Sequence, residues 1–124
     1  LEKLVTRRTR AIVVINPNNP TGAVYSRETL ERIARFAEQH RLVVLADEIY
    51  DQMTYDGAQY VPMATLVHDT LCCTLSGLSK IYRACGFRVG WAVFTGDREQ
   101  SAEYLQGLEL LSSLRLCSNV PGQW

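Results

Sequence analysis

The chain has 124 residues, of which 47% are hydrophobic and 21% charged, an ordinary composition for a folded globular domain. Its length allows one domain at most, large enough to bury a core, and its longest apolar runs are too short to cross a bilayer. Thirteen basic residues balance thirteen acidic ones, so no net field attracts nucleic acid or an anionic membrane, and we expect neither as a partner.

The first third of the chain is typical of strand, helix, strand. Residues 11–15 are a β-branched run that stops at an Asn/Pro/Gly cluster, as a strand buried on both faces does. Ser26 can cap the helix that follows, whose apolar positions fall at 30, 33, 34 and 37 and which should end near His40. Residues 42–46 predict a second buried strand, ending at Asp47.

The rest of the chain begins with an irregular connection. Residues 51–69 contain Gly57 and Pro62 with weak periodicity, and we expect a short helix over about 63–67. A third strand is predicted over 71–75. A fourth, over 89–95, should pair antiparallel because only a short turn precedes it. Asp97 with Gln100 resembles a capping box that opens an amphipathic helix running to about Leu116.

This order of elements predicts an α/β fold with a mostly parallel sheet flanked by helices. In such sheets ligands bind beyond the carboxyl ends of the strands. Asn19, Asp47 and Lys80 each lie just past the end of a different predicted strand. We therefore expect three polar groups that are distant in sequence to converge on one crevice.

Four cysteines stand at positions 72, 73, 85 and 117. None forms the C-x-x-C spacing of a zinc site, and the pattern indicates no disulfide framework. Three lie in apolar surroundings, where buried reduced thiols are common. The pattern predicts reduced cysteines, a cytoplasmic location and no metal site.

The segment Ser76-Gly77-Leu78-Ser79-Lys80 holds one lysine in a turn of small residues between two apolar runs, with Arg88 eight positions downstream. A primary amine held in this way can form a Schiff base with an aldehyde cofactor, and an arginine nearby can bind that cofactor's phosphate. The string alone is weak because Ser and Gly are common in loops. Its weight comes from two upstream segments, 16–22 and 46–50.

Four motifs carry a family resemblance: N-P-T-G at 19–22, D-E-x-Y at 47–50, S-K at 79–80 and G-F-R-x-G-W at 86–91. In this order and spacing they resemble the class I pyridoxal-phosphate-dependent aminotransferases of fold type I. More narrowly, the runs at 82–91 and 108–121 resemble bacterial alanine (glutamate–pyruvate) aminotransferases. The resemblance covers nearly the whole chain and implies an enzyme that moves an amino group between alanine, or a similar amino acid, and a 2-oxo acid such as 2-oxoglutarate.

The resemblance also implies roles for individual residues. Lys80 would hold pyridoxal 5′-phosphate and act as the catalytic base, and Asp47 would pair with the pyridine nitrogen. Tyr50 and Asn19 would donate hydrogen bonds to the phenolic oxygen of the ring, with Asn19 also contacting the substrate carboxylate. The phosphate would be bound by Ser79 and Arg88. The Asn19–Pro20 peptide bond is a candidate cis bond.

Two features depart from the family pattern. Many relatives carry Ser three residues before the lysine, where this chain has Gly77. The family's upstream phosphate loop, the aromatic residue that stacks on the ring, the downstream arginine for the substrate carboxylate and the small domain also have no counterpart. We therefore expect residues 1–124 to be part of the cofactor-binding large domain, inactive alone and homodimeric within a longer chain.

Other functions remain open from the residues. A carbon–sulfur lyase or another fold-type-I enzyme would share Asn19, Asp47, Tyr50 and Lys80. A truncated, non-catalytic remnant would keep the same motifs. A cofactor-sensing regulator is disfavoured, because nothing basic or helix-turn-helix-like occurs in these residues.

Overall fold

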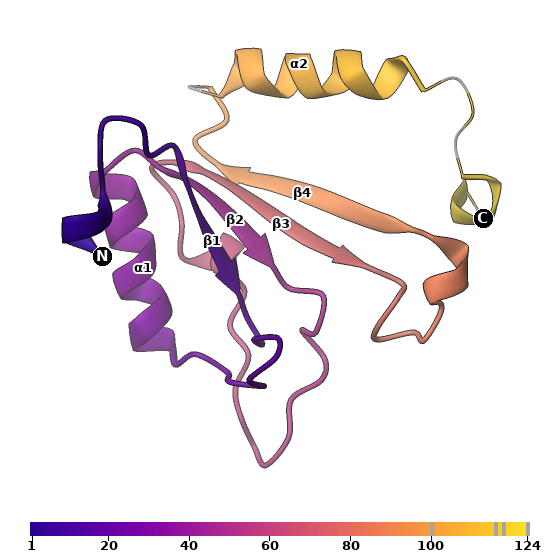
Figure 1. The fold of residues 1–124 in the computed structure, drawn as a ribbon, viewed down its shortest axis with the longest axis horizontal. Coiled ribbons are helices and arrows are strands. Elements are labelled where there is room, and N and C mark those ends of the chain that lie inside the picture. The colour runs from indigo at the N-terminus through magenta and orange to yellow at the C-terminus, as the bar shows by residue number, and fades with distance from the viewer. Residues whose placement is uncertain (100, 116, 118, 124) are drawn as a thin grey trace.

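Four strands form one sheet in the order β1-β2-β3-β4 in the computed structural model (Figure 1). β1 (Ala11–Ile15), β2 (Val43–Asp47) and β3 (Leu71–Gly77) run parallel, and β4 (Gly90–Gly96) pairs antiparallel with β3. The structure describes residues 1–99, 101–115, 117 and 119–123. The expected α/β class, the mostly parallel sheet and the antiparallel fourth strand are confirmed.

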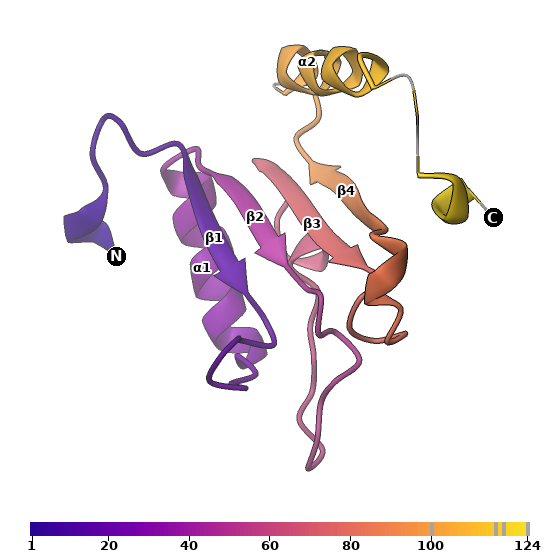
Figure 2. The same cartoon turned by 45° about the vertical axis from the view of Figure 1, so that its right-hand side comes forward.

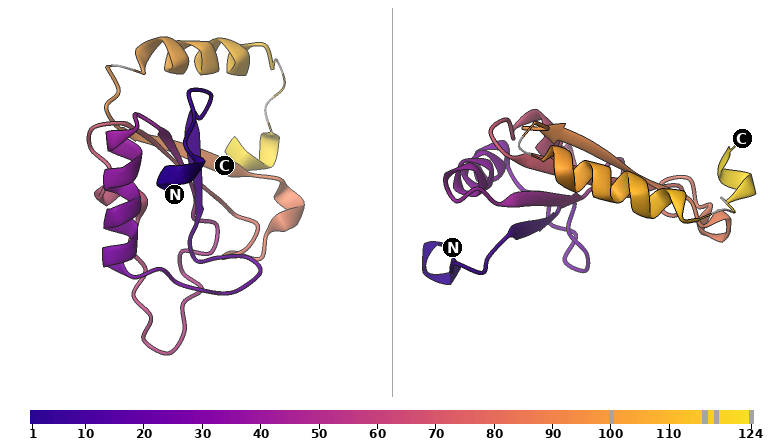
Figure 3. Two further views of the ribbon diagram at one scale, coloured as in Figure 1. Left: turned by 60° about the vertical axis from the view of Figure 1, so that its left-hand side comes forward. Right: turned by 90° about the horizontal axis from the view of Figure 1, so that it is seen from above.

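Helix α1 (Arg27–Gln39) covers one face of the parallel strands (Figures 1 and 3). The Ser26 hydroxyl accepts a hydrogen bond from the Thr29 N–H at 3.2 Å, the capping interaction that its position predicts. Residues at helical spacing on one side of α1 are buried against the sheet. The core that they form includes Leu30, Ala34, Ala37, Val14, Val44, Ala46 and Cys72.

The connection from β2 to β3 leaves the sheet at the carboxyl end of β2 and returns through a short 3-10 turn, η2 (Met63–Thr65), where a helix over 63–67 was expected. In Figure 1 the segment 51–62 extends well below the strands. Met63 is fully buried in the core, so the connection is anchored where it comes back to the sheet. Further 3-10 turns are η1 (Glu2–Leu4), η3 (Cys85–Phe87) and η4 (Val120–Gln123).

Helix α2 (Ala102–Ser113) is shorter than expected and begins later. The Asp97 N–H donates to the Thr70 carbonyl at 3.2 Å, so at this residue the chain is still bound to the sheet, and the helix follows only after a turn. The N-cap of α2 is Ser101 and not Asp97. Gln100 and Leu116, on which the prediction also rested, lie outside the described residues. α2 stands apart from the sheet in Figures 1 and 2, and none of its residues is buried.

The four cysteines are free thiols in two environments. Cys72 and Cys73 are buried in β3, whereas Cys85 and Cys117 are exposed, so two thiols are buried where three were expected. Burial raises the pKa of the Cys72 thiol to about 11. Within the described ranges no helix is long and apolar enough to cross a membrane, and no three His, Cys, Asp or Glu side chains gather closely enough to hold a metal ion.

Gly77, which stands where many relatives have serine, lies at a close approach of β3 to β4. A Cβ atom added to Gly77 would come within 2.8 Å of the Val89 carbonyl oxygen and 3.1 Å of the Gly90 Cα. Both neighbours are backbone atoms, in the first residue of β4 and in the residue before it, and a rotamer change cannot move them away. The departure from the family pattern therefore has a packing reason in this chain.

We expect Gly77→Ala to lower the free energy of unfolding by about 1–3 kcal/mol, because the added methyl group overpacks the β3–β4 contact. Urea unfolding of the protein that carries this chain measures the change. Gly107→Ala is the matched control, since a Cβ there meets no atom within 4 Å and alanine favours a helix interior. Equal stability of wild type and Gly77→Ala would contradict the close approach.

Candidate active site

The carboxyl ends of the three parallel strands meet at one end of the sheet, and predicted site residues follow each of them (Figure 2). Asn19 lies in the loop after β1, Asp47 is the last residue of β2, and Lys80 follows β3. Asp47 pairs in register with Ile15 on one side and Leu75 on the other. It therefore lies between the two strands that lead to Asn19 and Lys80.

Tyr50 lies close to both Asn19, in the loop after β1, and Lys80, in the connection after β3. Its hydroxyl accepts a hydrogen bond from Asn19 Nδ2 at 3.4 Å, and Lys80 Nζ lies 5.9 Å from the centroid of its ring. A cation at this distance is attracted to the ring face. The Asn19–Pro20 bond that shapes the first loop is cis, as the resemblance implied. The structure thus brings Asn19, Tyr50 and Lys80 together.

Asp47 is half-buried and its carboxylate is held locally. Asp47 Oδ1 accepts a hydrogen bond from the Ile49 N–H at 3.3 Å, and its carbonyl oxygen accepts one from the Asn16 N–H at 3.1 Å. Such a turn fixes an acidic side chain at the end of its strand. An anionic group held in this way is suited to pair with a cationic nitrogen.

Ser79 and Arg88 lie in the connection between β3 and β4 that also carries Lys80. The Leu78 N–H donates to the Val89 carbonyl at 3.1 Å, which closes this connection just outside Ser79 and Arg88. Ser79 is half-buried, whereas Arg88 is exposed and has a left-handed backbone with φ of 55°. The Arg88 guanidinium donates from Nη1 to the carbonyl of its own turn, at Cys85, at 2.8 Å.

Glu48 is a residue whose place in the site the sequence did not indicate. Its side chain is buried, and its carboxylate accepts hydrogen bonds from the Tyr60 hydroxyl and, at 2.8 Å, from the Met63 N–H. Tyr60 lies near the end of the segment 51–62, and Met63 is the first residue after it. The only signal in the sequence was its place inside the D-E-x-Y motif, because no periodic pattern links Glu48 to its partners.

The ionisation of Glu48 predicts a pH dependence of stability. Burial raises the pKa of this carboxyl above its usual value, against the opposing effect of the hydrogen bonds from Tyr60 and Met63. Its contribution to stability is therefore full below the unfolded pKa and is lost as the pH rises through the folded pKa.

We expect Glu48→Gln to remove this loss. Its free energy of unfolding should increase relative to wild type as the pH rises from about 4 toward neutrality. Urea unfolding across this range measures the difference. The same difference at every pH would show that Glu48 does not titrate in this way.

Other polar residues near the site are structural. Asn16 is buried and its Oδ1 accepts a hydrogen bond from the Tyr25 N–H at 2.9 Å. Asn18 Oδ1 accepts one from the Thr21 hydroxyl at 2.7 Å. These bonds shape the loop that presents Asn19, as expected for Asn residues that form turns.

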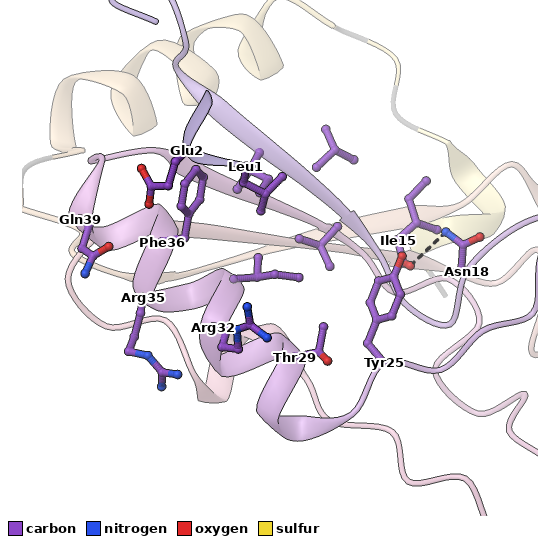
Figure 4. Close-up of a pocket in the computed structure, with 14 residues that line it drawn as sticks. Leu1, Glu2, Ile15, Asn18, Tyr25, Thr29, Arg32, Arg35, Phe36 and Gln39 are labelled. Carbon is purple, nitrogen blue, oxygen red and sulfur yellow. Dashed lines mark hydrogen bonds between the residues drawn. The ribbon is translucent and has the colours of Figure 1, made fainter. Parts of the chain in front are cut away.

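A hollow of about 820 Å³ lies elsewhere, between β1 and α1 (Figure 4). Its lining includes Ile15 of β1, Phe36 of α1 and Tyr25 from the loop between these elements. None of the six predicted site residues lines this hollow. The polar groups at the carboxyl ends of the strands, and not this hollow, are therefore the candidate site.

Comparisons with known proteins identify the family of the chain. The model of the family "Aminotransferase class I and II" matches residues 1–121. The chain belongs to the class I and II aminotransferases.

Among its relatives, the glutamate–pyruvate aminotransferase AlaA of Escherichia coli is 55% identical over 96% of this chain and 29% of its own length. The alanine aminotransferase of Mycobacterium tuberculosis is 51% identical over 99% of the chain and 29% of its own length. A crystal structure of an aminotransferase from Escherichia coli has a TM-score of 0.94 and 53% identity, covering 98% of this chain and 30% of that one. The chain thus spans less than a third of the relatives that it matches.

Proposed function

We propose that the protein that carries this chain is a pyridoxal-phosphate-dependent aminotransferase that converts alanine and 2-oxoglutarate into pyruvate and glutamate. The observation that carries the proposal is the convergence of Asn19, Tyr50 and Lys80 beside Asp47 at one end of the sheet. The identity of 51–55% to proteins named for alanine or glutamate–pyruvate transamination supports the choice of substrates.

The residues at this end of the sheet fit the cofactor by their chemistry. They supply the Lys80 amine, the Asp47 carboxylate and the uncharged donors of Asn19 and Tyr50. The β3–β4 connection that carries Lys80 also supplies a guanidinium and a hydroxyl. Bound there, pyridoxal phosphate would supply an aldehyde that condenses with amines and a ring that accepts electrons. Arg88 and the Ser79 hydroxyl would bind the phosphate, Arg88 through the planar set of donors of its guanidinium.

Lys80 is the proposed catalytic residue. Its Nζ would hold the cofactor and, as a free amine, would be the base for the proton of the substrate α-carbon. The assignment is supported by the position of Nζ, 5.9 Å from the centroid of the Tyr50 ring.

The other side chains hold the ring and the substrate. The Asp47 carboxylate would keep the pyridine nitrogen protonated, as its fixed place at the end of β2 allows. The Tyr50 hydroxyl and Asn19 Nδ2 would donate to the phenolic oxygen of the ring. Asn19 would also contact the substrate carboxylate, because its amide carries two donors.

We place residues 1–124 in the large, cofactor-binding domain of a longer chain. The groups that complete the substrate site would come from the rest of that chain, which accounts for more than two thirds of each relative. We further propose a cytoplasmic location, which free thiols favour, and a homodimer, which the family resemblance implies. Light scattering of the intact protein measures its mass in solution, and a monomer would overturn the dimer.

An assay of the purified intact protein with alanine and pyridoxal phosphate tests the proposed function. We expect pyruvate to form only when 2-oxoglutarate is added, with glutamate in equal amount. Release of sulfide from cysteine, or of ammonia without an acceptor, would indicate a lyase instead. No reaction with any amino acid, in a protein that folds, would indicate a non-catalytic remnant.

A further inference from the structure

Glu48 lies between two proposed cofactor ligands, Asp47 and Tyr50, yet the proposed chemistry gives it no role. Its side chain is only 3% exposed. A carboxylate is costly to bury unless it is hydrogen-bonded, so its place requires partners, and it has them in Tyr60 and Met63.

The bonds of Glu48 tie together both ends of the connection that begins at Tyr50. The Glu48 N–H donates to the Leu75 carbonyl of β3 at 2.9 Å, and the Glu48 carbonyl accepts from the Asp51 N–H at 3.0 Å, closing the turn that contains Tyr50. Its carboxylate holds the far end of the same connection through Tyr60 and Met63. Glu48 therefore binds the segment 51–62 at its start through its backbone and at its end through its carboxylate.

We propose that Glu48 is a positioning residue that holds the Tyr50 hydroxyl at the cofactor. This inference rests on the proposed function, because it requires Tyr50 to contact the ring. Removing the carboxylate leaves the Tyr60 hydroxyl and the buried Met63 N–H without their acceptor. The connection then shifts to find other partners, and the turn that carries Tyr50 shifts with it.

Glu38 of α1 provides a matched control. Its Oε1 also accepts two hydrogen bonds from a connection, from the His68 N–H at 2.8 Å and the Asp69 N–H at 3.1 Å. These bonds lie at the amino end of β3, opposite the site. Glu38 and Glu48 thus each accept two hydrogen bonds from a connection, at opposite ends of the sheet, and only Glu48 is close to Tyr50.

The test uses the intact protein with bound pyridoxal phosphate and the variants Glu48→Ala, Glu48→Gln, Tyr50→Phe, Glu48→Ala/Tyr50→Phe and Glu38→Ala. The readouts are the Kd for the cofactor and the pH midpoint of its visible absorbance. We expect Glu48→Ala to weaken cofactor binding about tenfold and to move the midpoint in the same direction as Tyr50→Phe. In the Tyr50→Phe background, Glu48→Ala should add little.

Two further results are expected. Glu48→Gln should resemble wild type, because its oxygen can accept from Met63 and its amide can donate to the Tyr60 oxygen. Glu38→Ala should lower Tm while the midpoint stays unchanged. If Glu48→Ala fails to fold, Tyr60→Phe replaces it, since that change removes one of the two hydrogen bonds and should move the midpoint the same way.

The proposal is overturned if Glu48→Ala lowers Tm with the midpoint unchanged, as Glu38→Ala does, or if its effect adds fully to that of Tyr50→Phe. An unchanged midpoint in Tyr60→Phe overturns it where Glu48→Ala does not fold. The proposed function fails separately, if wild-type protein shows no absorbance from bound cofactor.

Discussion

Lys80→Ala is expected to lower kcat/KM for transamination by about 10⁴-fold or more in the intact protein, because one amine supplies both the attachment point for the cofactor and the base that moves the α-proton. Steady-state assays with alanine and 2-oxoglutarate measure the loss. Tm should change little, since Lys80 is exposed and its removal creates no cavity.

Lys3→Ala is the control for this prediction, since Lys3 and Lys80 are the two lysines of the chain. Lys3 lies in η1, before β1 and away from the carboxyl ends of the strands. The control should keep wild-type activity. Loss of a catalytic base should leave far less than about a tenth of wild-type kcat/KM. If Lys80→Ala retained more than that, Lys80 would not be the base.

Asp47→Asn should lower kcat by about 10²–10³-fold, because the amide keeps the shape of the side chain and removes the charge that stabilises a protonated pyridine nitrogen. Binding of the cofactor should be weakened less than catalysis, since Lys80 and Arg88 remain. Turnover at saturating substrate, together with the cofactor Kd, separates the two effects.

Asp69→Asn provides the comparison for Asp47→Asn. Asp69 is exposed and lies in the connection before β3, at the opposite end of the sheet from Asp47. It should keep full turnover. Equal turnover by Asp47→Asn and wild type would remove Asp47 from the proposed site.

The parallel sheet and the meeting of the site residues could be predicted because both follow from local patterns. The run 11–15 is a strand with the predicted bounds, but it is not buried on both faces, because only Val14 is buried and Val13 is 63% exposed. The second strand begins and ends one residue later than expected. Since parallel strands end on the same side, placing Asn19, Asp47 and Lys80 after three such strands was enough to predict that they converge.

The hydrogen bonds that anchor the connection after β2 could not be predicted, because they join residues that are distant in sequence. Glu48 accepts hydrogen bonds from Tyr60 and Met63 across a segment with no periodicity. No local pattern therefore indicates which carboxylate these two residues contact. The start of α2 was misplaced for a similar reason. The Asp97 N–H is already bound to Thr70, in the connection before β3, and a capping pattern read locally does not include that partner.

The most direct test of the central claim is to reduce the intact protein with borohydride in the presence of pyridoxal phosphate and to map the labelled peptide by mass spectrometry. Reduction makes the link between the cofactor and its amine permanent. The account predicts the label on Lys80, in the peptide that contains Ser79. A label confined to Lys3 or to a lysine outside this chain, with Lys80 unmodified, would contradict it.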